Sequence, residues 1–363
     1  MERKDLFKKI SNYAFIAGLI CEIFVMPSGY TLLYLGYKYV TLLGMVCFAL
    51  SLLLSMDLKR DIKIFIPVFG FGLVCYYFQG SALMLRLALI ILAGRTQERD
   101  KVIKSFFFGT AAWIAVIFLL ALLGVKGSVF TEGAFRHSAD ELRFTFGFMH
   151  PNGFAFFWIK LAVMGMYLYG GRMKPWIACT VYAAGLIPLI MAMTKAGIAA
   201  YMFFALICLY LNADKDKDRS RKLLYYGGGG TMIALMLFIF TLGIVPYPQE
   251  HVGEIHNAWD AANELTTGRL QKARDVLTQN TPALFGSKGI DAVNEIGFVD
   301  ALYRQGIVFV AAYCVLLFVL LYRFNKENDT RAMFMLLCFT FYVIAESYLP
   351  LANKNAVWLL MLG

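Results

Sequence analysis

The stretch RFTFGFMHPNGFA, from Arg143 to Ala155, joins a charged loop to an apolar segment long enough to cross a membrane. It places an arginine and a histidine at the point where the apolar segment begins. Ionisable side chains in or beside a membrane span are unfavourable unless they are paired or solvated, so they indicate a functional position. The stretch therefore marks both the start of a predicted span and the first candidate site.

The composition of the chain predicts an integral membrane protein around this stretch. Of its 363 residues, 60% are hydrophobic and only 16% are charged, whereas soluble domains have about 25% charged residues. The apolar residues form repeated blocks near the ~20 residues that a helix needs to cross a bilayer. The alternation typical of a transmembrane barrel is not seen in the sequence. We predict an all-α polytopic membrane protein with one membrane domain over residues 1–363.

About 11–12 transmembrane helices are predicted, of which eleven are complete crossings. A final segment, residues 354–363, covers only about 15 Å of a hydrocarbon core of ~30 Å and is too short to cross. Residues 125–143 form a first predicted external loop, and residues 246–298 form a large one. The predicted crossings are residues 11–26, 30–56, 62–78, 81–94, 103–124, 144–170, 175–193, 196–211, 225–245, 299–322 and 332–349.

The net charge of +10 follows the predicted topology. Most of the lysines and arginines lie in every second short connection, counted from the N-terminus, so they lie on one side of the predicted membrane. This is the positive-inside pattern, and it predicts a cytoplasmic N-terminus. Nucleic-acid binding is therefore not expected.

The sequence predicts neither a disulfide framework nor a metal site. All seven cysteines lie inside apolar segments, away from an oxidising external loop. The histidines of His251-x-x-Glu254-x-His256 lack the HExxH spacing that places two ligands on one helix face. No resident metal or cofactor is expected.

Ionisable residues of the predicted spans gather at their external ends. This distribution favours an outward-facing polar cavity over a transporter, whose coupling charges usually lie near the bilayer midplane. Arginines in such a cavity suit a diphosphate, because guanidinium binds phosphate bidentately and stays charged. The residues concerned are Glu22, Arg86, Arg143, His150, Lys195, Asp300, Arg304 and Glu346.

Simpler interpretations stand beside the functional one. A lone basic residue near the end of a span can be an anchor that extends to the surface, which is the expectation for Lys38, Lys160 and Arg304. His150 can cap the helix that Pro151 begins. Gly227–Gly230 indicates either close helix packing or a weak point in a helix.

Four segments resemble, in order, the O-antigen ligase and polysaccharide polymerase superfamily. Arg143–Ala155 resembles its R-x-x-G-x-F-x-x-P-N-x-x-A opening. Thr194–Gly197 resembles its S-R-T/A turn, and Thr267–Arg269 resembles the S-G-R of its large outer loop. Asp300–Gly306 resembles its (H/D)-N-x-Y-x-x-x-x-x-G segment, with the glycine closer here.

This resemblance implies a site for a lipid pyrophosphate. Arg143 and Arg269 match family arginines implicated in binding it. Lys195 stands where many members have arginine, which implies a monodentate contact. Arg136 begins an Arg-x10-Gly pattern like that of the polymerases, and Arg86 is a further candidate from the chemistry of the leaving group.

The resemblance also implies a catalytic base. Asp300 stands where ligases carry a histidine proposed as the base, and Ala301 replaces the asparagine that usually follows. His150 is the second candidate, and Asp300 is preferred narrowly. The aspartate favours a repeat-unit polymerase over a core ligase.

The implied function is polymerisation of undecaprenyl-pyrophosphate-linked oligosaccharide repeat units for capsule, exopolysaccharide or O-antigen. The enzyme would be an integral-membrane glycosyltransferase at the outer face of a bacterial plasma membrane. Its partners would be that lipid-linked oligosaccharide, the bilayer and, as a further candidate, a chain-length regulator. The alternatives are a ligase that uses a different acceptor and a non-enzymatic lipid-linked oligosaccharide flippase or exporter.

Overall fold

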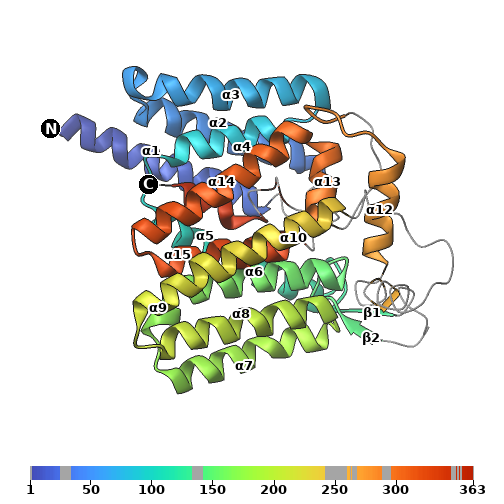
Figure 1. The fold of residues 1–363 in the computed structure, drawn as a ribbon. Helices are drawn as coiled ribbons and strands as arrows, with labels where there is room; N and C mark the ends of the chain where they lie inside the picture. The colour runs from blue at the N-terminus through green and yellow to red at the C-terminus, as the bar shows by residue number, and fades with distance from the viewer. Residues whose placement is uncertain are drawn as a thin grey trace. The chain divides into compact units, whose positions relative to one another are not determined.

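The computed structural model of the chain consists almost entirely of helices, coloured along the sequence in Figure 1. The chain divides into two compact units. Unit 1 comprises Met1–Val68, Ala88–Ser220 and Ala352–Gly363, and unit 2 comprises Phe69–Leu87 and Arg221–Leu351. The structure describes residues 2–24, 34–132, 142–241, 260–261, 263, 268–287, 296–344, 349, 351 and 354–362.

Seven helices in the described part of the chain are long and apolar enough to cross a membrane. This confirms a multi-pass, all-helical membrane protein. Three apolar helices are shorter, and α1 (Glu2–Phe24) is not among the seven. The eleven predicted crossings correspond to these seven, the three short helices and α1, so that count stays a prediction. The seven are Lys38–Ser55, Asp61–Gln79, Arg99–Leu122, Pro151–Arg172, Lys195–Ala213, Lys217–Thr241 and Ile307–Lys326, and the short ones are Leu83–Gly94, Pro175–Met191 and Thr330–Tyr342.

The N-terminal part of unit 1 is a tightly packed pair of helices, α1 and α2 (Tyr34–Ser55). The Ser11 hydroxyl donates to the Ser51 carbonyl at 2.9 Å. The Phe15 and Phe48 rings meet edge to face, with centroids 5.4 Å apart. A Cβ at Gly18 would lie 2.7 Å from the Phe48 ring, so glycine permits this close approach. Small residues let membrane helices pack in this way.

The centre of unit 1 is α6 (Pro151–Tyr169), which contacts α5, α7 and α8. Of the residues in its most apolar segment, 67% are buried inside the protein, against 11% in the corresponding segment of Asp61–Gln79. The helix is thus a core element and not a lipid-facing one. Around it are α5 (Arg99–Leu122), the 3-10 turn η2 (Gly170–Arg172), α7 (Pro175–Met191) and α8 (Lys195–Ala213), with η4 (Ala356–Met361) against α5.

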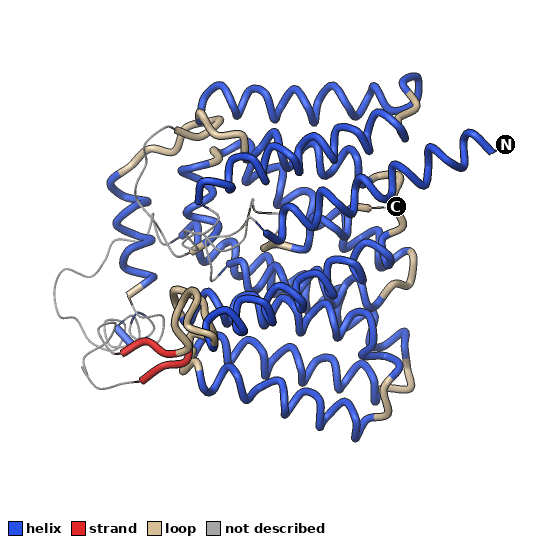
Figure 2. The backbone as a smooth tube through the Cα atoms, turned by 180° about the vertical axis from the view of Figure 1, so that it is seen from behind, coloured by secondary structure: helices blue, strands red, loops and turns tan. Residues whose placement is uncertain are grey.

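A short hairpin precedes α6, drawn in red in Figure 2. Strands β1 (Phe130–Glu132) and β2 (Leu142–Phe144) pair antiparallel, with Thr131 opposite Arg143. The predicted start of the span at residue 144 is therefore too early, because Phe144 is in the strand. Gly147 forms the turn with φ 87°, and a Cβ there would lie 2.7 Å from the Ile117 carbonyl oxygen.

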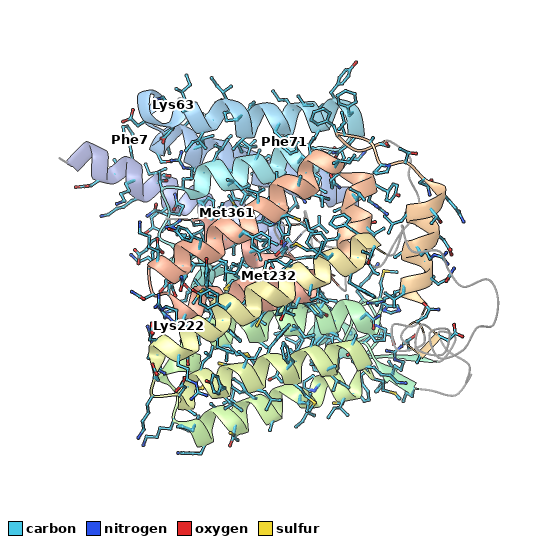
Figure 3. The ribbon with its side chains drawn as sticks, viewed as in Figure 1. Phe7, Lys63, Phe71, Lys222, Met232 and Met361 are labelled. Carbon is cyan, nitrogen blue, oxygen red and sulfur yellow. The ribbon has the colours of Figure 1, made fainter. Side chains whose placement is uncertain are left out.

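Unit 2 is built on α14 (Ile307–Lys326) and α15 (Thr330–Ile344), which contact each other. The π-helical segment η3 (Leu223–Gly228) and α10 (Gly229–Thr241) pack on α15. A Cβ at Gly229 would lie 3.2 Å from Leu321, and one at Gly228 would overlap Leu337. The four-glycine run thus provides close packing within a π-helical irregularity. Exposed Lys222 and buried Met232 flank it (Figure 3).

Three helices contribute residues to both units, namely α3 (Leu58–Gln79), α4 (Leu83–Gly94) and α9 (Lys217–Lys222). Within unit 2, the C-terminal end of α3 contacts the segment around Phe285, which precedes α13 in the sequence. The Gln79 side chain donates from Nε2 to the Phe285 carbonyl at 2.9 Å, and the Phe78 and Phe285 rings stack at 5.6 Å. The start of α14 is tied to the same segment.

The predicted span at residues 299–322 is two helices in the structure. Helix α13 (Gly297–Arg304) ends before Gly306, whose φ of 94° breaks the helix, and α14 begins at Ile307. The Ile307 and Val308 amides donate to the carbonyls of Ala283 and Leu284 at 3.0 and 3.1 Å. The break therefore places α13 outside the apolar span, which starts at Ile307.

Candidate functional site

In unit 1, Arg143 lies on β2 and binds the turn between α7 and α8. Its Nε and Nη2 donate to the Ala192 carbonyl at 3.3 and 3.1 Å, and Nη2 also donates to the Met193 carbonyl at 3.1 Å. Ala192 is the C-cap of α7. A cation is favourable there because the last carbonyls of a helix carry partial negative charge. Arg143 thus joins the hairpin to this turn.

The Thr194–Gly197 segment lies directly beside this arginine. Lys195 is the exposed first residue of α8, two positions after the Met193 carbonyl that Arg143 binds. A Cβ at Gly197 would lie 3.4 Å from the Ala155 Cβ, so the start of α8 packs closely against α6. Unit 1 therefore brings together two of the four segments that carry the family resemblance.

His150 is the N-cap of α6, as one interpretation of the sequence predicts. Its Nδ1 accepts a hydrogen bond from the Asn152 amide at 3.1 Å, and Pro151 follows as the first residue of the helix. In a neutral imidazole whose Nδ1 accepts, the proton lies on Nε2. The capping role is confirmed, and the role of His150 as a base stays a prediction.

The phenylalanines of the same stretch form an aromatic cluster that holds the turn before α6. Phe146 has a positive φ of 51° and stacks on Phe154, with centroids 4.2 Å apart. Phe148 meets Phe154 at 5.8 Å and Phe157 at 5.5 Å. Such offset and edge contacts favour one arrangement of the rings. Phe146 and Phe148, the two phenylalanines of the F-x-F pattern, therefore stabilise the turn before α6.

In unit 2, Asp300 is a buried carboxylate on α13 whose partner is one turn away. It is 7% exposed, and its Oδ1 lies 2.8 Å from Nε of Arg304. The contact is an ion pair without the alignment of a hydrogen bond. Burial raises the pKa of Asp300 to about 6, and the Arg304 charge partly opposes that rise. A carboxylate with this pKa can accept a proton near neutral pH.

Arg269 lies on α12 (Arg269–Gln279), which contacts α13 within unit 2. It is the first residue of its helix and only 9% exposed, and it follows Gly268 in the left-handed region with φ 79°. The Tyr303 hydroxyl donates to the Asn280 carbonyl at 2.9 Å and so joins α13 to the end of α12. Arg269 and Asp300 therefore belong to helices that pack together.

The remaining predicted residues are placed as follows. Arg86 lies on α4 in unit 2 and is 5% exposed. Arg143, His150 and Lys195 belong to unit 1, whereas Arg86, Arg269 and Asp300 belong to unit 2. Arg136 and Glu346, together with about half of the predicted external loops, lie outside the residues that the structure describes.

One expectation is wrong and one contact was missed. Lys160 does not extend to the surface, because it is fully buried, with Nζ 4.5 Å from the Phe106 centroid and 5.1 Å from the Phe157 centroid. These are cation–π contacts, which are strongest where the cation is desolvated. The sequence interpretation also missed Arg304 as the partner of Asp300, although their (i, i+4) spacing indicates it.

No protein-family model matches the chain, and no curated protein or solved structure is significantly similar to it.

Proposed function

We propose that the protein is an integral-membrane glycosyltransferase that polymerises lipid-pyrophosphate-linked oligosaccharide units at the outer face of a bacterial plasma membrane. The observation that supports this most directly is Asp300, a buried carboxylate with its pKa raised to about 6 beside Arg304. It lies on a short helix outside the apolar spans. A base is needed there because a sugar hydroxyl must lose its proton to attack.

In the proposed reaction, an acceptor hydroxyl attacks the anomeric carbon of the donor glycan. The bond from that carbon to the pyrophosphate oxygen breaks, and the hydroxyl proton passes to Asp300. The lipid pyrophosphate leaves as an anion, which a fixed guanidinium stabilises without reorganisation. Arg269 and Arg86 are the proposed donors, because both belong to the same unit as Asp300.

Asp300 is a better base than His150 on chemical grounds. The Nδ1 lone pair of His150 already accepts the Asn152 amide, so proton transfer to that atom would break the cap of α6. The carboxylate of Asp300 makes one off-axis ion pair and keeps further acceptor capacity. Asp300 is therefore the proposed base.

The test replaces Arg269 with alanine in cells that depend on this protein for their polymer. Loss of one charge-stabilising donor is expected to lower transfer by about 10²–10³-fold. Glycan analysis should show single lipid-linked units in place of a ladder. Lys272→Ala is the matched control, because Lys272 is exposed on the same helix.

Two other products would contradict the proposal. Normal-length polymer from Arg269→Ala at a normal protein level would exclude its role in binding pyrophosphate. A deletion strain that accumulates single units on the cytoplasmic side would indicate a flippase, and full-length polymer that is not attached to its final acceptor would indicate a ligase.

A further inference from the structure

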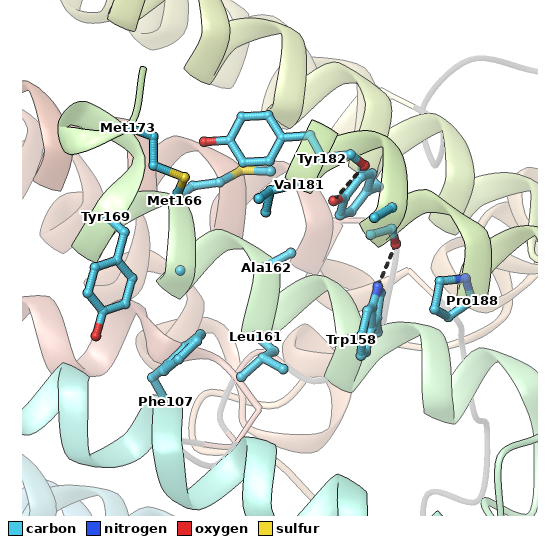
Figure 4. Close-up of a pocket in the computed structure, with 14 residues that line it drawn as sticks. Phe107, Trp158, Leu161, Ala162, Met166, Tyr169, Met173, Val181, Tyr182 and Pro188 are labelled. Carbon is cyan, nitrogen blue, oxygen red and sulfur yellow. Dashed lines mark hydrogen bonds between the residues drawn. The ribbon is translucent and has the colours of Figure 1, made fainter. Parts of the chain in front are cut away.

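A partly open cavity of about 430 Å³ lies among α5, α6, α7 and α8 in unit 1 (Figure 4). Its walls are apolar and include Phe107, Leu161, Met166, Val181 and Pro188. Its volume is within the range of ~300–1,000 Å³ that is usual for small-molecule sites. Three of its four helices contain candidate membrane spans. We therefore expect the cavity to lie at the depth of the hydrocarbon core.

Trp158, Tyr182 and Tyr201 are polar residues of the wall whose side chains already have hydrogen-bond partners within the protein. The Trp158 indole donates to the Gly185 carbonyl at 2.7 Å, and the Tyr201 hydroxyl donates to the Tyr182 carbonyl at 3.0 Å, both drawn as dashed lines in Figure 4. The Tyr182 hydroxyl contacts Cys208 Sγ at 3.1 Å. Because these groups are satisfied, the middle of the cavity favours an apolar occupant.

The length of the cavity matches one leaflet of a bilayer. Along α6 its lining runs from Trp158 to Tyr169, which is about 16 Å at the helical rise. One leaflet contributes half of a hydrocarbon core of ~30 Å. Tyr169 and Met173 lie toward one end in Figure 4, and Trp158 and Pro188 lie toward the other. An acyl chain that enters at the Tyr169 end would fill this length.

Three exposed basic residues lie close in sequence to cavity-lining residues at that end. Arg172 and Lys174 flank Met173, which lines the cavity, and Lys104 lies one turn before Phe107 on the same face of α5. None of the three forms an ion pair with any residue that the structure describes. Basic side chains at a membrane surface attract anionic headgroups. The cations therefore complement a phosphate.

We propose that this cavity binds an acyl chain of an anionic phospholipid, whose headgroup phosphate lies among Lys104, Arg172 and Lys174. The lipid belongs to the leaflet that faces the turn between α6 and α7, which the positive-inside pattern predicts to be cytoplasmic. The proposal is independent of the glycosyltransferase reaction. A bound lipid would fill space between α6 and α7 and stabilise unit 1.

Native mass spectrometry of the full chain tests the site, with phosphatidylglycerol and phosphatidylcholine as the added probes. Ala184→Phe places a ring in the cavity, whereas Ala183→Phe adds the same ring at an exposed neighbour that does not line it. Arg172→Gln with Lys174→Gln removes two cations, and Lys215→Gln is the exposed single-charge control.

The expected result is one retained phosphatidylglycerol on the parent protein and both controls. Ala184→Phe should retain it roughly tenfold less, because the added ring fills the space of the acyl chain. The double variant should also retain it roughly tenfold less, because each surface cation contributes measurably to headgroup binding. Brominated phosphatidylglycerol should also quench the fluorescence of Trp158, measured as the difference from Trp158→Phe.

Four results would overturn the proposal. In mass spectrometry these are equal retention of phosphatidylglycerol by all variants, equal binding of phosphatidylcholine, and retention of an isoprenoid lipid in place of a phospholipid. In nanodiscs it is absence of quenching at Trp158 by brominated phosphatidylglycerol.

Discussion

At the scale of single residues, Asp300 and Arg304 carry the chemistry that can be tested most sharply. Asp300 has its pKa raised to about 6 by burial. As the proposed base it must be ionised, so transfer should fall as the pH drops through about 6. At pH 5 only about a tenth of the Asp300 carboxyl groups are ionised. The transfer rate of the reconstituted protein at pH 5 should therefore be roughly tenfold below its rate at pH 8. Asp300→Asn should abolish transfer at every pH.

Arg304 provides the control for this prediction. Its charge opposes the rise in the Asp300 pKa, so Arg304→Gln should move the pH profile of transfer to higher pH. Arg304→Lys keeps the charge and should leave the profile nearly in place. A shift to lower pH in Arg304→Gln, or an unchanged profile, would show that Asp300 is not the titrating base.

The same carboxyl also affects stability, with a definite sign. Its pKa is higher in the folded protein than its ordinary value. Protonation therefore favours folding, and this contribution is lost as the pH rises from about 4 through about 6. Thermal unfolding in detergent should show that Asp300→Asn is stabilised relative to the parent at pH 8 and less so at pH 4. The reverse order would contradict the burial of the charge.

At the scale of elements, the break between α13 and α14 decides where Asp300 lies. Gly306 has a φ of 94°, and a Cβ there would overlap the backbone of Leu284 and Gly286. Gly306→Ala should lower the unfolding free energy by more than about 1 kcal/mol, because it strains the turn and displaces the neighbouring backbone. Chemical unfolding in detergent measures this change.

Gly230 is the matched control for Gly306. It lies in α10, and a Cβ there would meet nothing within 4 Å. Gly230→Ala should be neutral or stabilising by up to about 1 kcal/mol, because alanine favours a helix interior. Equal destabilisation by the two substitutions would mean that the break has no special need for glycine.

At the scale of the molecule, the helices predict a topology for unit 1. Val125 follows α5, and Lys215 follows α8. Three apolar helices, α6, α7 and α8, lie between these two positions. An odd number of crossings puts the two positions on opposite sides of the membrane, with Lys215 cytoplasmic by the positive-inside pattern. Intact cells should label Val125→Cys with an impermeant maleimide and leave Lys215→Cys unlabelled.

The parent protein and permeabilised cells control this experiment. The parent contains seven cysteines that lie in helices, so its labelling sets the background. Permeabilisation should make Lys215→Cys reactive. Labelling of both positions in intact cells would show that α7, the shortest of the three helices, does not cross.

The sequence by itself determined the helical membrane class and the approximate positions of the apolar helices, although the starts of α6 and α14 were predicted too early. Length and hydropathy are local properties, and a bilayer requires helices of a minimum length whatever their neighbours are. It also indicated the His150 cap as one of two interpretations, because Pro151 and Asn152 are adjacent to it. These features depend on a few neighbouring residues and so can be predicted without a tertiary structure.

Only the tertiary structure decided which charged residues are buried and what they contact. Arg143 binds carbonyls 49 and 50 residues away. Gln79 binds the Phe285 carbonyl, 206 residues away, in the segment that pairs with the start of α14. Lys160 is fully buried because α5 and α6 place two rings around it. Such contacts depend on how distant helices pack, and no local pattern of residues specifies that packing.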